Sequence, residues 1–265
     1  MTVESHRPRK RFGQHFLKDF HVVQRIVAAV DPRPGDHLVE IGPGMGVLTQ
    51  ELLPLAGKLD AVELDRDIIP KLHATCLPLG ALTIHSADAL RFDFCALAVA
   101  EEKLRIVGNL PYNISTPLIF RLIEQIHCIQ DMHFMLQKEV VDRLAAAPNC
   151  ADYGKLSIMI QTHCQVQHLF NVPPDAFSPP PKVDSAVVRM IPHPSPPVDL
   201  KDPALFEKIV TAAFAQRRKT LRNNLKDWLN ADQWHAIGID PQRRAETLSL
   251  EEFARLANAV NAHHP

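Results

Sequence analysis

The stretch HLVEIGPGMGVLT, residues 37–49, combines a short apolar strand, a glycine-rich loop and the beginning of a helix. Glycine allows the backbone to approach a ligand closely, and a helix N-terminus presents N–H groups without partners. A dinucleotide-binding fingerprint requires glycines at positions one, three and six. Here Gly42, Gly44 and Gly46 occupy positions one, three and five, and Val47 occupies position six. The spacing disfavours a nicotinamide dinucleotide and favours a nucleoside without a pyrophosphate. A purely structural turn is the simpler alternative.

A polar residue stands at or just after the end of each of the next three expected strands. These strands are expected at residues 58–63, 82–85 and 104–107, and the polar residues are Glu63, Asp88 and Asn109. Open α/β sheets bind ligands outside the carboxyl ends of their strands. We therefore expect Glu63 to hold ribose hydroxyl groups and Asp88 to accept a hydrogen bond from an adenine amine. The simpler alternatives are a surface acid for Glu63 and a turn cap for Asp88.

The tetrapeptide Asn109-Leu110-Pro111-Tyr112 follows the last of these strands. Proline fixes its own φ and favours an extended conformation in the residue before it. The side chain of Asn109 and the carbonyl of Leu110 can then face one point, with the ring of Tyr112 beside them. Two acceptors and an aromatic face suit a planar ring that carries an exocyclic amine. For the tetrapeptide alone, a strand-to-helix turn with a buried tyrosine is an equal alternative.

Hydrophobic periodicity predicts further elements along the chain. Helices are expected from Asp19 to Asp31, from Val47 to about Leu55, from Asp65 to Thr75, around residues 118–126, from Lys138 to Ala147 and from Leu156. Strands are expected at residues 132–136 and 183–190, the second of them at an edge of the sheet. The candidate residues therefore lie in loops that follow strands.

Residues 172–189, VPPDAFSPPPKVDSAVVR, are expected to be stiff and extended because prolines bracket Phe177. Phe177 is either a packed anchor or the second face of an aromatic clamp. Five prolines between residues 192 and 203 indicate a linker, and the residues after it look entirely helical. We therefore expect one domain at residues 1–191, with a basic N-terminal arm, and a helical domain at residues 192–265.

Two segments are locally basic although the formal net charge of the chain is -1. In the N-terminal arm, cations interleave with Phe12, Phe16 and Leu17, which fits a solvated tail that partly docks or a nucleic-acid arm. No acid interrupts residues 216–226, where a helix is expected to present its cations on one face. A solvated face is the alternative to contact with RNA or DNA phosphate. The nucleic-acid candidates are Arg9, Lys10, Arg11, Arg217, Arg218, Lys219, Arg222 and Lys226.

Composition excludes several other classes of protein. A chain of 265 residues suits one large domain or a large and a small one. The five cysteines form no CxxC pair, and their odd number favours reduced thiols in a cytosolic protein. The sequence contains no Cys/His cluster typical of a metal site, and no apolar run approaches the length of a membrane span. We therefore expect a soluble cytoplasmic protein without a metal.

The motifs together, in this order, resemble those of the bacterial small-subunit (16S) rRNA adenine dimethyltransferases. The motifs are RKRFGQHFLKD (residues 9–19), VEIGPGMGVLT (39–49), VELDRD (62–67), the Asp88 loop, VGNLPYNIS (107–115) and FSPPPKVDSAVVRM (177–190). The resemblance extends from about residue 9 to the C-terminus. It implies an α/β, Rossmann-like, seven-stranded S-adenosylmethionine-dependent methyltransferase fold with a small all-helical C-terminal domain. Many relatives have asparagine where this chain has His15. The implied cofactor contacts are His15, Leu17, Gly42, Gly44, Glu63, Asp88 and Asn109.

The same resemblance implies a substrate and a partner. The substrate would be two adjacent adenosines in a hairpin near the 3′ end of 16S rRNA, each receiving two methyl groups on N6. The partner would be that rRNA within the small ribosomal subunit or its precursor, bound by a monomer. The implied catalytic residues are Asn109, Leu110, Tyr112 and Phe177.

Several competing functions share part of this pattern. A 23S rRNA adenine methyltransferase uses the same chemistry, but the PPPKVDS segment and the basic C-terminal segment favour the small-subunit enzyme. A DNA adenine methyltransferase usually carries an acidic residue where this chain has Asn109. A non-catalytic ribosome-assembly factor could keep the fold, but the presence of Glu63, Asp88, Asn109 and Tyr112 disfavours a loss of catalysis.

Overall fold

The computed structural model describes residues 15–261, which form two compact units. The first unit comprises residues 15–141 and 167–192, and the second comprises residues 142–166 and 193–261. The chain crosses from the first unit to the second after Pro192, beside the expected boundary at residues 191/192. Residues 142–166, however, group with the helical unit, because Ala146, Tyr153 and Ile158 belong to the hydrophobic core of that unit.

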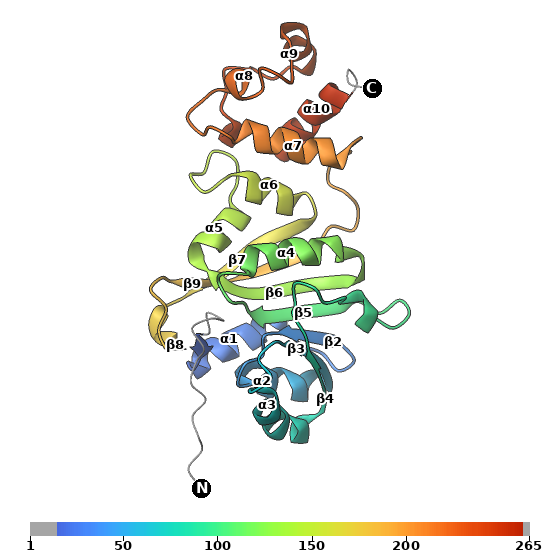
Figure 1. Cartoon of the computed structure of the whole chain (residues 1–265), viewed down its shortest axis with the longest axis vertical. Coiled ribbons are helices and arrows are strands. Elements are labelled where there is room, and N and C mark those ends of the chain that lie inside the picture. The colour runs from blue at the N-terminus through green and yellow to red at the C-terminus, as the bar shows by residue number, and fades with distance from the viewer. Residues whose placement is uncertain (1–14, 262–265) are drawn as a thin grey trace. The chain divides into compact units, whose positions relative to one another are not determined.

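A seven-stranded sheet organises the first unit (Figure 1). The strands follow the order β4-β3-β2-β5-β6-β9-β7. They are β2 (His37–Ile41), β3 (Lys58–Glu63), β4 (Ala81–Ser86), β5 (Leu104–Asn109), β6 (Ile129–Gln137), β7 (Cys164–Val172) and β9 (Ser185–Pro192). Neighbours from β4 to β6 pair in parallel, whereas β9 is antiparallel to β6. The predicted α/β fold class is therefore confirmed, and the carboxyl ends of β2, β3, β4 and β5 share one edge of the sheet.

Helices connect these strands and close the core of the first unit. They are α1 (Phe20–Val30), α2 (Val47–Ala56), α3 (Ile69–Cys76), α4 (Ser115–Glu124) and α5 (Lys138–Ala145). Helix α1 begins after Asp19, whose carboxylate accepts hydrogen bonds from the N–H groups of His21 and Val22. Gly46 precedes α2 with a φ of 82°, and a Cβ atom there would lie 2.8 Å from Leu72 of α3. Glycine at this position therefore permits both the sharp entry into α2 and its packing against α3.

The expected edge strand at residues 183–190 is instead an interior strand. Strand β9 lies between β6 and β7, and β7 forms the edge. Six consecutive residues from Ser185 to Met190 pair with Gln137 to Met132 of β6. No strand was expected at residues 164–172, so β9 had no predicted neighbour on its outer side. The residues of β7 are buried, intermediate and exposed in irregular succession, so the sequence gives no clear period of two there.

A second, two-stranded sheet joins the start of the described chain to the proline-rich segment. In it, β1 (Phe16–Leu17) pairs with β8 (Phe177–Ser178) in antiparallel register. The N–H groups of Lys18 and Asp19 also donate to the carbonyl of Ala176, at 2.9 and 3.2 Å. We call residues 15–19 the N-terminal strap. The expected docking of Phe16 and Leu17 is confirmed, whereas Phe12 lies outside the described residues.

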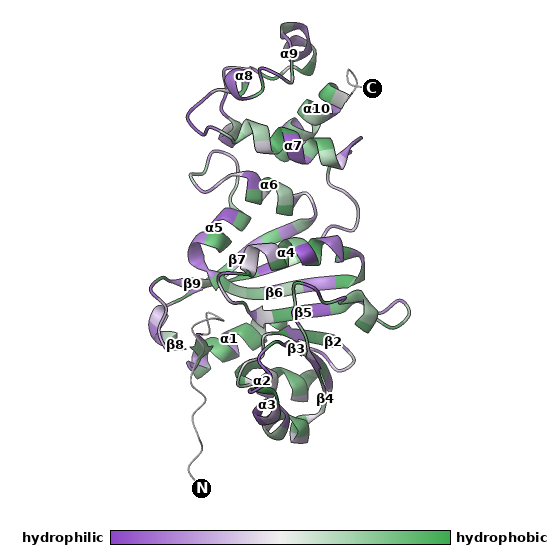
Figure 2. Ribbon diagram, viewed as in Figure 1, coloured by the Kyte–Doolittle hydropathy of each residue, from purple (hydrophilic) through white to green (hydrophobic). Residues whose placement is uncertain are grey.

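Helices dominate the second unit, as expected for the residues after the linker. They are α6 (Lys155–Gln161), α7 (Pro203–Ala213), α8 (Leu221–Asn224), α9 (Ala231–Ile237) and α10 (Leu250–Asn261). In α7 and α10, hydrophobic and hydrophilic segments alternate around the ribbon (Figure 2), as in helices with one buried face. Phe206, Trp234 and Phe253 contribute to the core. No helix within residues 15–261 is long and apolar enough to cross a membrane.

The prediction of a helix over residues 216–226 is wrong. Helix α8 contains only Leu221–Asn224, and Thr220 before it has an extended backbone with φ -72° and ψ 161°. The side-chain amide of Asn224 donates to the carbonyls of Ala213 and Gln216, at 2.6 and 3.1 Å. These bonds satisfy carbonyl groups at the end of α7 and compete with a continuous helix. The cations of this segment therefore do not share one helix face.

The expectation of reduced thiols is wrong for Cys95 and Cys128, which form a disulfide. The two residues are 33 positions apart in the sequence, so a search for local CxxC pairs cannot detect them. The side chain of Gln125 brings their segments together by accepting hydrogen bonds from the N–H groups of Phe94 and Cys95, at 2.7 and 3.3 Å. Cys76, Cys150 and Cys164 are free thiols.

Candidate active site

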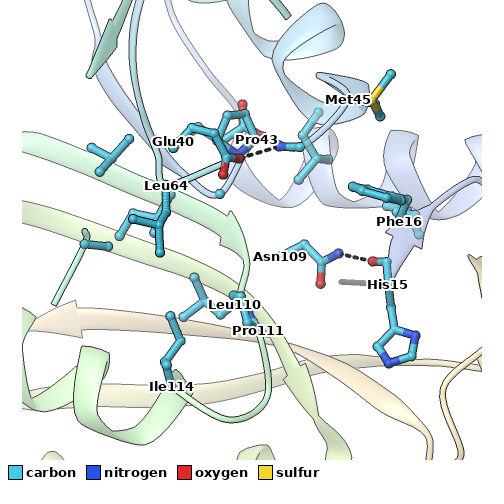
Figure 3. A pocket seen from close by; sticks show the side chains of 18 of the residues that line it. His15, Phe16, Glu40, Pro43, Met45, Leu64, Asn109, Leu110, Pro111 and Ile114 are labelled. Carbon is cyan, nitrogen blue, oxygen red and sulfur yellow. Dashed lines mark hydrogen bonds between the residues drawn. The ribbon is translucent and has the colours of Figure 1, made fainter. Parts of the chain in front are cut away.

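A cavity of about 310 Å³ lies at the carboxyl edge of the sheet, between the glycine loop, the strap and the loop after β5 (Figure 3). It contains all the candidates for cofactor binding and three of the four candidates for catalysis. These lining residues are His15, Leu17, Gly42, Gly44, Glu63, Asp88, Asn109, Leu110 and Tyr112. The strand-end residues meet because the parallel strands end at one edge of the sheet. The β1–β8 pairing brings His15 and Leu17 beside them.

The glycine loop folds back onto the end of β3. Gly42 and Gly44 have φ values of 66° and 57°, in the left-handed region that favours glycine. The N–H of Gly44 donates to Oε2 of Glu63 at 3.2 Å. A Cβ atom on Gly44 would lie 3.1 Å from the ring of Phe16. Glycine at position 44 therefore lets the aromatic ring of the strap lie directly against the loop, a contact that the sequence alone did not indicate.

Glu63 is almost fully buried at the end of β3, with 6% of its surface exposed. Burial raises the pKa of its carboxyl group, whereas hydrogen bonds from the N–H groups of Asp65 and Gly44 favour the ionised form. Each carboxylate oxygen accepts one of these backbone bonds and keeps further acceptor capacity. The arrangement suits the two neighbouring hydroxyl groups of a ribose.

A second buried carboxyl group, that of Glu40, was missed as a site residue. Glu40 lies in β2 directly before the glycine loop, is 1% exposed and lines the cavity. The hydroxyl of Thr49 donates to its Oε2 at 2.6 Å. Burial raises the pKa of Glu40 to about 7, and the charge of Glu63 contributes to the increase. The signal available in the sequence was an acid inside an otherwise apolar strand.

Asp88 caps a turn and also lines the cavity. Its Oδ1 accepts a hydrogen bond from the N–H of Leu90 at 3.0 Å, so the residue caps a turn. The same residue lines the cavity, together with the aliphatic side chains of Leu64, Leu90 and Ile114. Leu64 is 52% exposed although it is strongly apolar. Aliphatic walls beside an acceptor suit a planar, amine-bearing ring, and these walls were also missed by sequence reasoning.

The strap determines how the side-chain amide of Asn109 is oriented. Nδ2 of Asn109 donates to the backbone carbonyl of His15 at 3.0 Å. A carbonyl can only accept, so the amide must present its nitrogen to the strap and its oxygen to the other side. Figure 3 shows this oxygen on the side of Leu110 and Pro111. The chain therefore offers the acceptor oxygen of Asn109 beside the Leu110-Pro111 turn.

Tyr112 is held at several points beside this acceptor. Its hydroxyl lies 2.7 Å from Oγ of Ser185, and its carbonyl accepts from the hydroxyl of Ser115 at 3.1 Å. The imidazole of His15 stacks against its ring with centroids 5.7 Å apart and an interplanar angle of 26°. Nδ1 of His15 lies 2.8 Å from the carbonyl of Pro179, which only accepts, so Nδ1 donates. The His15 backbone thus faces the cavity at Asn109 (Figure 3), while its ring packs against Tyr112.

Phe177 does not line the cavity. It is 1% exposed, pairs with Leu17 across the β1–β8 ladder and belongs to the main hydrophobic core of the first unit. Of the two readings of Phe177, the described arrangement matches a packed anchor rather than a base-stacking face. Leu17 of the strap is buried in the same core. The aromatic ring beside Tyr112 is that of His15.

The candidate nucleic-acid contacts divide into two groups. Arg9, Lys10 and Arg11 lie outside the described residues. The remaining candidates, Arg217, Arg218, Lys219, Arg222 and Lys226, are all exposed in the second unit. The backbone of this segment bonds to residues 241–243, which brings the half-exposed Arg244 into the same neighbourhood. We call these six residues the basic cluster. Arg244 was missed because it is distant in the sequence.

One group of potential metal ligands occurs within residues 15–261. The ligand atoms of Cys95, His127 and Cys128 lie within 4.8 Å of one another. Both sulfur atoms belong to the disulfide, so neither offers a thiolate to an ion. The group therefore does not act as a metal centre in this form of the chain.

Comparisons with known proteins agree with this geometry. The model of a family described as ribosomal RNA adenine dimethylase matches residues 5–262. A ribosomal RNA small subunit methyltransferase A from Laribacter hongkongensis is 58% identical over 97% of both chains. The protein of the same name from Pseudomonas aeruginosa is 56% identical over 96% of this chain and 95% of its own.

Two solved structures share the fold over nearly the whole chain. A dimethyladenosine transferase from Plasmodium falciparum has a TM-score of 0.80 at 28% identity, and the match covers 94% of this chain and 98% of that one. The 23S rRNA methyltransferase ErmE has a TM-score of 0.73 at 23% identity, with coverages of 93% and 99%. At that identity, the likeness to ErmE concerns the fold alone.

Proposed function

Because the chain belongs to the ribosomal RNA adenine dimethylase family, we propose that it dimethylates N6 of two adjacent adenosines in small-subunit (16S) rRNA. The adenosines are those of a hairpin near the 3′ end, and the methyl donor is S-adenosylmethionine. The observation that carries the proposal is the oriented amide of Asn109, whose oxygen faces the Leu110-Pro111 turn beside Tyr112. It provides an acceptor for an adenine amine next to a cavity suited to a nucleoside.

The cavity residues fit the nucleoside part of the proposed donor. Glu63 would accept hydrogen bonds from the two ribose hydroxyls, and Asp88 would accept one from the adenine amine, with Leu64 and Leu90 against the ring. The positive-φ residues Gly42 and Gly44 place no side chain at their two positions in the cavity lining, where the backbone can approach the donor closely. When bound, S-adenosylmethionine supplies a methyl group on a positively charged sulfur. The acids Glu40 and Glu63 make the cavity favourable for a cation.

The residues of the NLPY turn would make the target nitrogen reactive. The N6 lone pair of adenine is delocalised into the ring and is a poor nucleophile. Hydrogen bonds from its two N–H groups to Asn109 Oδ1 and the Leu110 carbonyl favour a pyramidal nitrogen with an available lone pair. Tyr112 would stack on the base, a contact worth roughly 1–3 kcal/mol. No base is needed before the transfer, because the nitrogen can lose its proton after the new N–C bond has formed.

We assign the two parts of the chain different tasks within this function. The first unit would bind the donor and the target base, and the helical unit would hold the rRNA through its basic cluster. When protein cations neutralise phosphates, the counterions of the rRNA are released, and this stabilises binding to the rRNA backbone whatever its base sequence. Base selection would remain with Asn109, Leu110 and Tyr112.

Methyl transfer from labelled S-adenosylmethionine to unmethylated small ribosomal subunits tests the proposal. We expect label in N6,N6-dimethyladenosine, and mapping of the modified rRNA should place it at two adjacent adenosines near the 3′ end. Label confined to large-subunit rRNA would instead support the 23S alternative. Label confined to DNA, or no transfer to any nucleic acid, would overturn the proposal.

Ionisation of Glu40 should make donor binding depend on pH. The donor carries an ammonium, a sulfonium and a carboxylate, and so a net positive charge. It should favour ionised Glu40, whose pKa in the free protein is about 7. Donor affinity should therefore fall about tenfold between pH 8 and pH 6, because binding must then release a proton. Calorimetric titrations in buffers of different ionisation enthalpy would measure this proton release.

The Glu40 carboxyl group also makes the free energy of unfolding depend on pH. This free energy should fall as pH rises, whereas donor affinity should increase. A raised carboxyl pKa means that the fold favours the protonated form, so its stabilising contribution is complete below the ordinary value of 4.5 and is lost as pH rises toward about 7. Replacing Glu40 with glutamine should flatten both pH dependences. If Glu40→Gln retained the full pH dependence of donor affinity, Glu40 would not be the linked group.

Removal of three cations from the basic cluster should weaken binding of the small subunit. We expect Arg218→Ala, Lys219→Ala and Arg222→Ala together to lower affinity at least tenfold at low salt. The slope of log K against log salt should also fall by about 0.7–0.9 for each phosphate that is no longer neutralised. Filter binding at several salt concentrations measures both. A matched triple variant of the exposed Lys201, Lys208 and Arg255 should bind almost normally. Equally weak binding by the two triple variants would contradict a localised RNA contact.

A further inference from the structure

We infer that Ser185 is a positioning residue for methyl transfer, because its hydroxyl holds the far end of Tyr112 and so fixes the direction of the ring that receives the target base. The inference rests on the proposed function, which assigns Tyr112 to stacking on adenine. Tyr112 Oη and Ser185 Oγ lie 2.7 Å apart although the residues are 73 positions apart in the sequence. Ser185 does not line the cavity and acts only through Tyr112.

The position of the Ser185 hydroxyl is itself fixed by the sheet. Ser185 is fully buried and is the first residue of β9, where it pairs with Gln137 of β6. The carbonyl of the preceding residue, Asp184, accepts a hydrogen bond from the N–H of Lys138 at 2.9 Å. The backbone on both sides of the β6–β9 junction is therefore tied, so the hydroxyl cannot follow a displaced tyrosine ring without breaking the ladder.

The backbone contacts of Tyr112 leave its ring orientation undecided. The hydroxyl of Ser115 donates to the Tyr112 carbonyl, and the N–H of Ile114 donates to the Pro111 carbonyl. These bonds locate the main chain of the turn but place no restraint on the side-chain torsions, so χ1 of Tyr112 is not set by them. The bond to Ser185 restrains the far end of the ring. A ring anchored at Cβ and at Oη has a defined long axis.

The position of the ring matters because methyl transfer is sensitive to the position of the attacking nitrogen. Asn109 and Leu110 would locate N6, whereas Tyr112 would locate the body of the base. A displacement of about 1 Å from the reactive arrangement can cost roughly 10²-fold in rate. Both partners are uncharged at neutral pH, since burial raises the pKa of Tyr112 and serine does not ionise. The contribution of Ser185 should therefore be the same at pH 7 and pH 8.5.

Tyrosine NMR provides a direct test that needs no substrate. The chain has two tyrosines, and the hydroxyl of the other, Tyr153, donates to the Leu248 carbonyl in the second unit. In ring-labelled protein, Ser185→Ala should shift the Cζ resonance of Tyr112, while that of Tyr153 should remain unchanged. An unchanged Tyr112 resonance would overturn the inference.

Kinetics then test whether the positioning matters for the reaction. In single-turnover methylation of small subunits, Ser185→Ala should lower the rate about three- to tenfold, the usual value of one hydrogen bond, with little change in donor or subunit affinity. Tyr112→Phe removes the same bond from the other side. The double variant should therefore be as fast as Tyr112→Phe alone, at both pH values. Fully additive effects would mean that Ser185 acts independently of the Tyr112 hydroxyl, and would overturn the inference.

A matched control separates positioning from general destabilisation. Ser157 is equally buried, and its hydroxyl donates to the Arg143 carbonyl in the second unit. Ser157→Ala should leave the transfer rate unchanged well below its melting temperature. If the wild-type chain methylated adenosine and Ser185→Ala were equally fast, the inference alone would fail. If the wild-type chain methylated no adenosine, the proposed function would fail, and with it the catalytic part of the inference.

Discussion

Asn109→Ala should lower the single-turnover rate of methyl transfer about 10²–10³-fold, the usual effect of removing one oriented hydrogen-bonding group from an active site. The affinity for small subunits should remain near that of the wild-type chain, because the RNA grip is assigned to the basic cluster. Rapid-quench measurements with saturating donor report the rate, and filter binding reports the affinity. An alanine variant with a near-normal rate would remove Asn109 from the mechanism.

Asn109→Asp sharpens this prediction, because it keeps the shape of the side chain but replaces its amide donor by a second, negatively charged acceptor oxygen. The amide nitrogen of Asn109 donates to the His15 carbonyl at 3.0 Å. A carboxylate would direct an oxygen at that carbonyl, and two acceptors repel each other at hydrogen-bond distance. We expect the aspartate variant to be as slow as alanine or slower, and to loosen the strap. Asn171→Ala, outside the cavity in β7, serves as the matched control and should be fully active.

Glu63→Gln should weaken donor binding about 10²-fold, because hydrogen bonds to an ionised group contribute roughly 1.5–3 kcal/mol each. Glutamine has one acceptor oxygen, whereas Glu63 accepts from both Asp65 and Gly44 with separate oxygens. The substitution should therefore also release the glycine loop from the end of β3. Equilibrium dialysis with labelled donor measures the affinity, and thermal unfolding without donor measures the effect of releasing the loop.

A conservative control distinguishes removal of the ribose contact from a general reduction of charge. Glu51 lies on α2 outside the cavity, where it accepts a hydrogen bond from Gln24. Glu51→Gln should leave donor affinity unchanged. Donor affinity that is equal in Glu63→Gln and in the wild-type chain would contradict the assigned ribose contact, whatever its effect on thermal stability.

Local signals in the sequence predicted most of the first unit. The helix after Asp19, the glycine loop and the strands at residues 37–41 and 58–63 depend on neighbours within a few positions. The acids at the strand ends were predicted to meet for the same reason, since parallel strands end at one edge. The cavity contains Glu63 and Asp88 as expected. Periodicity failed at residues 216–226, where the bonds of the Asn224 side chain outweighed a helical pattern.

Phe177 shows why other parts of the site could not be predicted. Its sequence neighbours allow either an anchor or an aromatic wall, and the choice depends on Leu17, its partner in the β1–β8 ladder. Burial of Phe177 follows from that pairing between distant segments. Sequence patterns describe residues a few positions apart and do not include such a contact. The disulfide between Cys95 and Cys128 was missed for the same physical reason.

The sequence by itself determined the succession of helices and strands between residues 19 and 145, the glycine loop and the residue types at the strand ends. Short-range effects decide these features: side-chain period, capping and the conformational freedom of glycine. Only the tertiary structure decided the orientation of the Asn109 amide and the direction of the Tyr112 ring. Their partners, the His15 carbonyl and the Ser185 hydroxyl, are 94 and 73 positions away. Such bonds exist only once the strap and β9 have closed around the carboxyl edge of the sheet.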